Sequence, residues 1–262
     1  MSYRLWNQST TESRRDSAYS QALIRRAAAT LGPDVTVDTF GLPAGTYHGR
    51  AVSRAVSNAF VYHRILDRMI DQAIAAEREE YDGFVIGSFS EPFLTEIRSA
   101  VDIPVVSVLE TTLLVGCSLG SKLAFITTSP NVDEMVKKAV AYHKMEDRVA
   151  AVLSVEPALE GTVLHSAFDN PAPVVASFEQ AAERAIARGA DVIIPAEGII
   201  AIIVTEQGVT RFKDAPVMDV FSVTWRYAMM LADLKISTGL GMTRRGRFAR
   251  PDTELIELIS RR

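Results

Sequence analysis

Two stretches of one pattern, Asp82-Gly83-Phe84-Val85-Ile86-Gly87-Ser88 and Asp191-Val192-Ile193-Ile194-Pro195-Ala196-Glu197, decide how this chain folds. Each begins with an acidic residue, continues through an apolar run and ends at a polar residue. A short apolar run of this kind is typical of a strand buried on both faces of a parallel sheet. We therefore expect Ser88 and Glu197 to lie at the carboxyl ends of two buried strands.

Two further pairs of patterns repeat in the same order. A proline opens an apolar strand at Pro104–Val108 and again at Pro216–Val220. A strand runs into a hydroxyl-rich turn at Leu5–Thr10 and again at Phe125–Ser129. Three pairs in one order predict two similar halves facing each other, with Ser88 and Glu197 as counterparts across a cleft.

The fold class follows from the alternation of apolar runs with segments of helical period along the 262 residues. We predict an α/β fold of two pseudo-symmetric halves, each a mostly parallel sheet flanked by helices, with the active site in the cleft between them. Residues 1–110 plus 222–262 are predicted as the first half, with a C-terminal helix and tail, and 111–221 as the second. The predicted strands are Tyr3–Trp6, Val35–Phe40, Gly83–Gly87, Val105–Val108, Leu123–Thr127, Val149–Val155, Val192–Ile194 and Val217–Val220. The clearest helical segments are Ser53–Glu80, as one helix or two joined near Tyr62, Val132–His143 and Pro173–Arg188.

Composition narrows the class of protein. The chain is 48% hydrophobic with a net charge of −4, so it can bury a core and has no general attraction to nucleic acid. No apolar run approaches the roughly 18 residues that span a bilayer. We expect a cytoplasmic protein with neither a membrane nor a nucleic acid as partner. The one basic segment, Thr243–Arg250, is predicted as a solvated arm or as a subunit contact in a homo-oligomer.

The sequence predicts neither a metal site nor a cofactor. One cysteine, Cys117, and four histidines cannot form an internal disulfide or a cysteine-rich zinc site. No Gly-x-Gly-x-x-Gly segment follows a strand, and there is no Walker loop. Cys117 itself is interpreted as a buried structural residue.

Polar residues at the ends of predicted strands are the candidate ligand-binding groups, because ligands of parallel sheets bind beyond the carboxyl ends of strands. Asn7, Ser9 and Thr10 follow the first strand, and Thr127 and Thr128 follow its counterpart. Such groups cap the next helix, bind an anion, or do both.

Ser88 and Glu197 are the candidate catalytic residues. Ser88 lies in Gly87–Pro92 and has no pKa near neutrality, so it would donate a hydrogen bond or need a neighbouring base; a capping box with Glu91 is the alternative. Glu197 precedes Gly198 and an apolar run, where burial should raise its pKa towards general acid/base work. A partner arginine or a capped helix is the alternative for Glu197.

Several other polar residues are weaker candidates. Glu110 and Asp219 are interpreted as structural or as supporting the site, and His48 as an exposed residue of a glycine-rich loop that could close over a substrate. His143 has no spaced acidic partner in the sequence and is given no role.

These motifs resemble the aspartate/glutamate/hydantoin racemase superfamily over most of the chain. The segment Asn7–Thr10 resembles the Asn-Pro-Asn-Thr/Ser turn of hydantoin racemases, and Ser88–Pro92 resembles their Cys-Phe-x-Asp-Pro. Ile126–Thr128 resembles their Val-Thr-Thr, and Gly189–Ile194 and Ala215–Asp219 resemble their second-half strands.

The resemblance implies two α/β halves and an active site in which two cysteines, one from each half, move a proton. Those cysteines match Ser88 and Glu197 here, and Cys117 matches neither. Without thiols, we predict a cofactor-independent isomerase or racemase in which Glu197 is the general acid/base and Ser88 assists, acting on a small carboxylate or a hydantoin-like cyclic amide. The substrate-binding residues would be Asn7, Ser9, Thr10, Phe89, Thr127, Thr128 and Gly198. A lyase such as a decarboxylase, a hydrolase of a cyclic amide or ester, and a non-catalytic protein that binds small acids are the alternatives.

Overall fold

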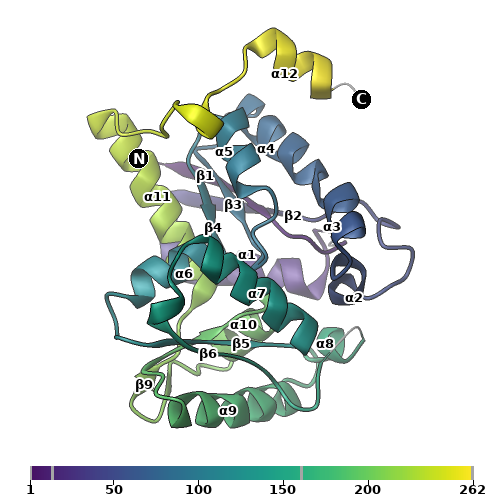
Figure 1. Ribbon diagram of the computed structural model, residues 1–262, viewed down its shortest axis with the longest axis vertical. Helices are drawn as coiled ribbons and strands as arrows, with labels where there is room; N and C mark the ends of the chain where they lie inside the picture. Colours follow the sequence, from purple (N-terminus) through teal and green to yellow (C-terminus); the bar gives the residue numbers. More distant parts are fainter. Residues whose placement is uncertain (1, 13–14, 160–161, 261–262) are drawn as a thin grey trace.

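The computed structural model describes residues 2–12, 15–159 and 162–260, and its α/β architecture confirms the predicted fold class (Figure 1). One sheet has four parallel strands in the order β2 (Val35–Phe40), β1 (Tyr3–Gln8), β3 (Gly83–Ile86) and β4 (Val105–Ser107). Short apolar strands buried on both faces are what the repeated pattern indicated, and β3 is buried throughout.

The second sheet repeats the order of the first. Its three parallel strands are β6 (Val149–Ser154), β5 (Leu123–Thr127) and β7 (Val192–Pro195), so β5, β6 and β7 occupy the places of β1, β2 and β3. A small antiparallel pair, β8 (Arg211–Phe212) and β9 (Ala215–Pro216), follows. The division of the chain at residues 110 and 222 stays a prediction.

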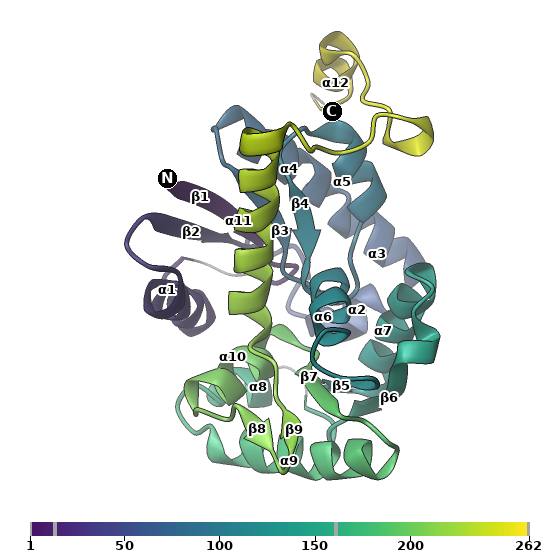
Figure 2. The same cartoon turned by 90° about the vertical axis from the view of Figure 1, so that its left-hand side faces the viewer.

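Helices cover both sheets. Figure 2 shows α11, the longest helix drawn, running along the first sheet from the second, while α9 lies across the far side of the second sheet. Within the described ranges no helix is both long and apolar enough to cross a membrane. The helices are α1 (Ala18–Leu31), α2 (Val52–Val56), α3 (Ala59–Leu66), α4 (Arg68–Arg78), α5 (Leu94–Ala100), α6 (Val108–Gly116), α7 (Pro130–Tyr142), α8 (Thr162–Ser166), α9 (Ala172–Ala187), α10 (Gly198–Glu206), α11 (Val220–Thr238) and α12 (Thr253–Ser260), with 3-10 turns at Glu146–Arg148 and Gly246–Phe248.

The predicted helical segment Ser53–Glu80 is wrong as one or two helices, because it forms α2, α3 and α4. Asn58 ends the first piece: its Oδ1 accepts the N–H groups of Phe60 and Val61 at 3.0 and 3.2 Å and so caps α3. The next break is at Asp67. Apolar periodicity continues across both breaks, which hid them from the sequence pattern.

Two smaller predictions also need correction. The predicted strand Val217–Val220 reduces to one parallel bridge between Ile193 and Val217, because Asp219 accepts the N–H of Ser222 and starts α11. Cys117 is only partly buried, since it follows the last residue of α6 and leaves the core there.

One hydrophobic core joins the two sheets. It includes Leu5 and Val85 from the first sheet and Phe125 and Ile194 from the second, all fully buried. Trp225 of α11 lies in the same core and donates its indole N–H to Asn7 Oδ1 at 3.0 Å. The carboxyl ends of the two sheets are therefore held in a fixed relation by shared packing.

Candidate active site

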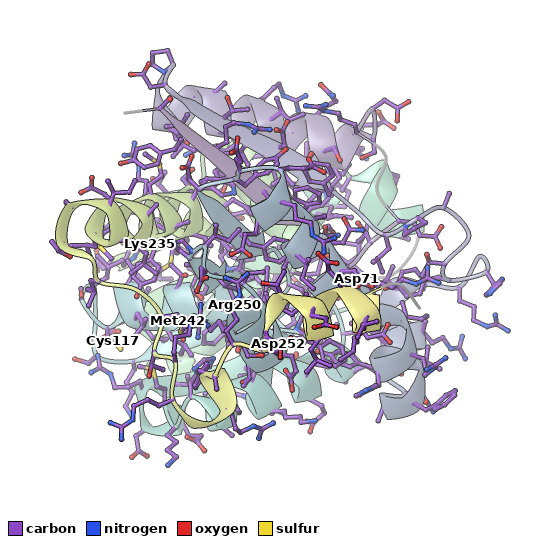
Figure 3. The ribbon with its side chains drawn as sticks, turned by 90° about the horizontal axis from the view of Figure 1, so that it is seen from above. Asp71, Cys117, Lys235, Met242, Arg250 and Asp252 are labelled. Atoms are coloured by element: carbon purple, nitrogen blue, oxygen red, sulfur yellow. The ribbon has the colours of Figure 1, made fainter. Side chains whose placement is uncertain are left out.

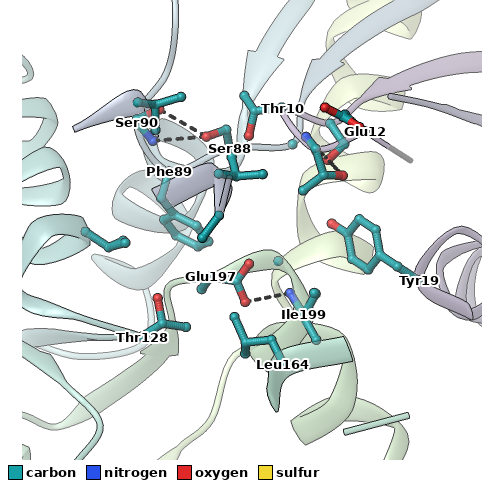
Figure 4. Close-up of a pocket in the computed structure, with 18 of the residues that line it drawn as sticks. Thr10, Glu12, Tyr19, Ser88, Phe89, Ser90, Thr128, Leu164, Glu197 and Ile199 are labelled. Atoms are coloured by element: carbon teal, nitrogen blue, oxygen red, sulfur yellow. Dashed lines mark hydrogen bonds between the residues drawn. The ribbon is translucent and has the colours of Figure 1, made fainter. Parts of the chain in front are cut away.

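A cavity of about 540 Å³ lies between the ends of the two sheets (Figure 4). This volume suits a small organic ligand. Turns that follow β1, β3, β5 and β7 supply its polar groups, as the rule for parallel sheets predicts. The polar lining from these turns consists of Ser9, Thr10, Thr11, Glu12, Ser88, Ser90, Thr128 and Glu197.

Glu197 lies on the cavity wall and also caps α10. Its Oε2 accepts the N–H of Ile199 at 2.8 Å (Figure 4) and that of Ile200 at 3.0 Å, so the helix-capping alternative is correct. No arginine among the described residues pairs with it. Burial raises the pKa of Glu197, and the backbone N–H donors oppose that rise only in part. The carboxyl is thus tuned to exchange a proton nearer to neutral pH than an exposed glutamate.

Tyr19 is a cavity residue that sequence reasoning missed. A Cβ built on Gly198 would lie 2.5 Å from the Tyr19 hydroxyl, a distance that real contacts do not show, so only glycine fits there without movement. Burial and the nearby charge of Glu197 raise the pKa of Tyr19, and its side chain also bonds Ser9. Tyr19 therefore remains a neutral phenol. Its position in the first turn of α1, after the hydroxyl-rich turn, was the available signal.

Ser88 has no general base among its described partners. Its Oγ shares a hydrogen bond with Ser90 Oγ at 3.1 Å and accepts the Ser90 N–H at 3.4 Å. The expected capping box with Glu91 is wrong, because α5 begins only at Leu94 and the Glu91 carboxylate bonds elsewhere. Ser88 can donate a hydrogen bond to a ligand, whereas proton abstraction would need help that these contacts do not supply.

Glu91 fastens the Ser88 turn to two other elements. Its buried carboxylate accepts from the Ser107 hydroxyl, from the Glu110 N–H at 3.0 Å and from His143 Nε2 at 2.6 Å. Leaving His143 without an acidic partner was therefore wrong. Burial works against its charge, but the bond to Glu91 and the charges of Glu91 and Glu110 outweigh this and raise the pKa of His143. The imidazolium form favoured by these contacts strengthens the link.

Most of the predicted substrate-binding residues come together. Ser9, Thr10, Phe89, Thr128 and Gly198 line the cavity with Ser88 and Glu197. Asn7 and Thr127 do not line it: the Asn7 side chain is buried against Trp225, and the Thr127 hydroxyl donates to Asp133. Through these hydrogen bonds Asn7 and Thr127 fix the ends of β1 and β5, from which the lining residues follow.

The weaker candidates lie outside the cavity. Glu110 forms a two-point ion pair with Arg98, and Asp219 pairs with Arg26 and caps α11, so both are structural. His48 is exposed on its loop at a positive φ of 50° and does not line the cavity.

An apolar wall and one cation complete the cavity. Arg50, on the loop after β2, lines it, and no periodic pattern in the sequence marks this residue. Apolar side chains from α2, α3, α7 and the α8 region form an apolar wall of the cavity: Val52, Val56, Leu66, Val132, Met135, Leu164 and Phe168.

Comparison with known proteins places the chain in a family. The model of the Asp/Glu/Hydantoin racemase family matches residues 17–196, and the chain belongs to that family. A hydantoin racemase from Pseudomonas sp. (strain NS671) is 28% identical over 81 residues, which are 31% of this chain and 32% of the length of that racemase.

Solved structures share the fold over nearly the full length. An allantoin racemase from Klebsiella pneumoniae superposes with a TM-score of 0.76 at 20% identity, covering 96% of this chain and 95% of that one. A mutant of arylmalonate decarboxylase superposes with a TM-score of 0.60 at 17% identity, covering 94% and 98%.

Proposed function

We propose that this protein is a cofactor-independent isomerase or racemase in which Glu197 moves a proton on a small carboxylate or a hydantoin-like cyclic amide. The observation that carries the proposal is the raised pKa of a carboxyl that lines the cavity and is fixed by two backbone hydrogen bonds. A general base works best when its pKa lies near the operating pH. Family membership favours proton transfer next to a carbonyl over other uses of such a carboxyl.

The proposed reaction uses one base. Ionised Glu197 removes a proton from the carbon next to the substrate carbonyl, and the electron pair moves onto the carbonyl oxygen. Hydroxyl groups of Ser88, Thr10 and Thr128 line the same cavity and would stabilise that oxygen. Protonated Glu197 then delivers the proton to a neighbouring atom, which isomerises the substrate, or back to the same carbon after the planar intermediate has turned over in the cavity, which inverts that carbon. Because Ser88 has no base partner, we favour exchange on one face over transfer between two faces.

Decarboxylation is the second candidate function. The apolar wall beside Glu197 would desolvate a substrate carboxylate and favour its loss as CO₂, after which protonated Glu197 would supply a proton to the carbanion. The fold shared with the arylmalonate decarboxylase is compatible with such a site.

We also propose a cytoplasmic homo-oligomer with neither nucleic acid nor membrane as partner. Support comes from the C-terminal helix α12, which exposes Leu255, Leu258 and Ile259 on the surface. Figure 3 shows α12 and the preceding segment lying over the body of the molecule, with Arg250 directed towards it. That arm is tied down by Arg250, which pairs with Glu77 and Asp102. Light scattering of Leu258→Glu would show a lower mass than wild type if α12 forms the contact.

Hydrogen–deuterium exchange tests the function. Wild type is incubated in D₂O with 5-benzylhydantoin or 2-phenylpropionate, and loss of the substrate C–H signal is followed by NMR. Glu197→Gln should slow exchange at least about 100-fold, because the amide oxygen keeps the helix cap and only the proton carrier is lost. Glu206→Gln, at the other end of α10 and paired with Arg25 on the surface, is the control and should exchange as wild type.

The label also separates the alternatives. Deuterium in recovered substrate supports the isomerase or racemase, and deuterium only in a product that has lost CO₂ supports the decarboxylase. A ring-opened product indicates a hydrolase, and binding without any exchange indicates a protein that binds small acids. Exchange that survives in Glu197→Gln contradicts the proposal.

A further inference from the structure

The charges around the cavity are unevenly compensated. Among the described lining residues Arg50 is the one cation, against the two carboxyl groups of Glu12 and Glu197. Glu12 is already occupied, since it accepts the N–H of Gly45 at 3.0 Å and the N–H of Tyr47. Glu197 is fixed by the N-terminus of α10 and has a raised pKa. Neither carboxyl group forms an ion pair with Arg50.

Arg50 has no ion pair with any other residue of the described ranges. The residue is exposed to solvent and belongs to the cavity lining, whereas Arg98, Arg244 and Arg250 are bound to carboxylates. An unpaired guanidinium keeps its planar donors available for a ligand.

The loop that carries Arg50 is anchored to the hydroxyl-rich turn. The Arg50 N–H donates to the carbonyl of Tyr47 at 3.0 Å, and the buried Tyr47 donates its hydroxyl to the carbonyl of Thr10 at 2.6 Å. Thr10 lines the cavity itself. These two hydrogen bonds connect the backbone at Arg50, through Tyr47, to the turn of Thr10, which would bind the reacting carbonyl group.

Directly after Arg50 the lining becomes apolar. Ala51, Val52 and Val56 continue along α2, and Leu66 follows from α3. A ligand that reaches Arg50 therefore contacts hydrocarbon beside it. A second carboxylate would meet this wall, Glu12 or Glu197, with no further cation among the described lining residues.

The geometry points to Arg50 as the residue that binds the carboxylate of the substrate, and to a monocarboxylic acid with an aryl or branched alkyl substituent as the substrate class. The guanidinium would hold the carboxylate through charge-assisted hydrogen bonds, and the apolar wall would take the substituent. This inference rests on the proposed function, which places proton transfer at Glu197. Of the two proposed substrate classes it favours the carboxylate over the cyclic amide.

Binding measurements test this assignment separately from turnover. The probes are phenylacetate, its neutral analogue phenylacetamide, and acetate, each titrated calorimetrically into the full-length protein. We expect Arg50→Gln to weaken phenylacetate about tenfold and to leave phenylacetamide unchanged, because only the charged pair is lost. Arg50→Lys should restore part of the loss, since it keeps the charge and loses the planar fork.

Two controls exclude general effects. Arg54→Gln removes an exposed cation four positions away that does not line the cavity, and it should leave every affinity unchanged. Acetate should bind wild type at least about tenfold more weakly than phenylacetate, because it leaves the apolar wall uncovered. Added salt should weaken phenylacetate and not phenylacetamide.

The assignment is overturned if Arg50→Gln weakens the acid and the amide equally or weakens neither, or if wild type binds the amide and not the acid. Failure of the proposed function gives a different signature. In that case Glu197→Gln would exchange deuterium as wild type does, while the effect of Arg50→Gln on phenylacetate binding would persist.

Discussion

The turn after β3 and the turn after β7 occupy equivalent places in the two sheets and are built differently. The first, Gly87–Pro92, presents the neutral hydroxyl of Ser88 and is fastened from below by Glu91. The second, Ala196–Gly198, presents the ionisable Glu197, which caps α10, and the Ala196 N–H ties the turn to the Ile126 carbonyl of β5 at 2.7 Å. One repeated strand pattern therefore places a hydroxyl group on one wall of the cavity and an ionisable carboxyl group on the other.

The two turns differ in whether the carboxyl group that fixes the backbone also lines the cavity. Both turns are held by hydrogen bonds, but the ionisable group at the first turn, Glu91, makes its three hydrogen bonds with residues that do not line the cavity. At the second turn the carboxyl that fixes the backbone is the one that meets the ligand space. We infer that the two walls contribute unequally to any proton transfer.

The largest expected effect is on activity. Glu197→Gln should reduce deuterium exchange at least about 100-fold, whereas Ser88→Ala should reduce it about tenfold or less, since it removes one hydrogen-bond donor and no base. The ratio of the two initial rates, measured by NMR on the same substrate, checks this. Equal losses would show that both walls carry protons.

The next effect is on stability at the first turn. Glu91→Gln should lower the free energy of unfolding by about 2 kcal/mol, because the buried Ser107 and the partly buried His143 lose a charged acceptor. Urea denaturation measures it. Glu96→Gln, on the exposed surface of α5, is the control and should change the free energy of unfolding little. An equal loss in this control would show that the hydrogen bonds of Glu91 do not account for the effect.

A smaller effect is expected at the second turn. Gly198→Ala should cost about 1 kcal/mol more in wild type than in Tyr19→Phe, because removing the phenol oxygen removes the closest clash. The four proteins of this cycle are compared by chemical denaturation. Additive costs would indicate that the Tyr19 hydroxyl moves aside freely.

The smallest effect concerns pH. Because the pKa of His143 is raised in the folded protein, its bond to Glu91 stabilises the fold fully below the unfolded pKa of about 6.5, and this contribution is lost as pH rises through the folded pKa. The difference in unfolding free energy between wild type and His143→Gln should therefore shrink from pH 6 towards pH 9. A difference that grows with pH would contradict this assignment.

The parts of the fold that depend on local patterns could be predicted from the sequence. Buried parallel strands show as apolar runs, so both sheets and the counterparts Ser88 and Glu197 were found. Helix ends set by a single side chain, such as Asn58, were hidden inside a continuous apolar period. Contacts between distant segments were missed for another reason: Glu91 and His143 are 52 residues apart, and no local pattern joins them.

The same limit applies to the site. Five of the seven residues predicted to bind substrate do line the cavity. Asn7 and Thr127 are the other two, and the sequence could not show that Trp225 and Asp133 take up their side chains. Tyr19 and Arg50 line the cavity from a helix and a loop, where the strand-end rule does not apply.

The path of α11 has a consequence for the order in which the molecule forms during synthesis. The four strands of the first sheet are all synthesised once Ser107 has been added. The helix that covers one face of that sheet, α11, ends only at Thr238. This helix supplies Trp225, which binds Asn7, and Ala228, which lies beside Gly83. The strands of the second sheet and the helices α7 and α9 that pack on it are all complete by Pro195. We expect the second sheet to fold first on the growing chain, while the first waits with an apolar face uncovered. The cavity between them would then be among the last features to form.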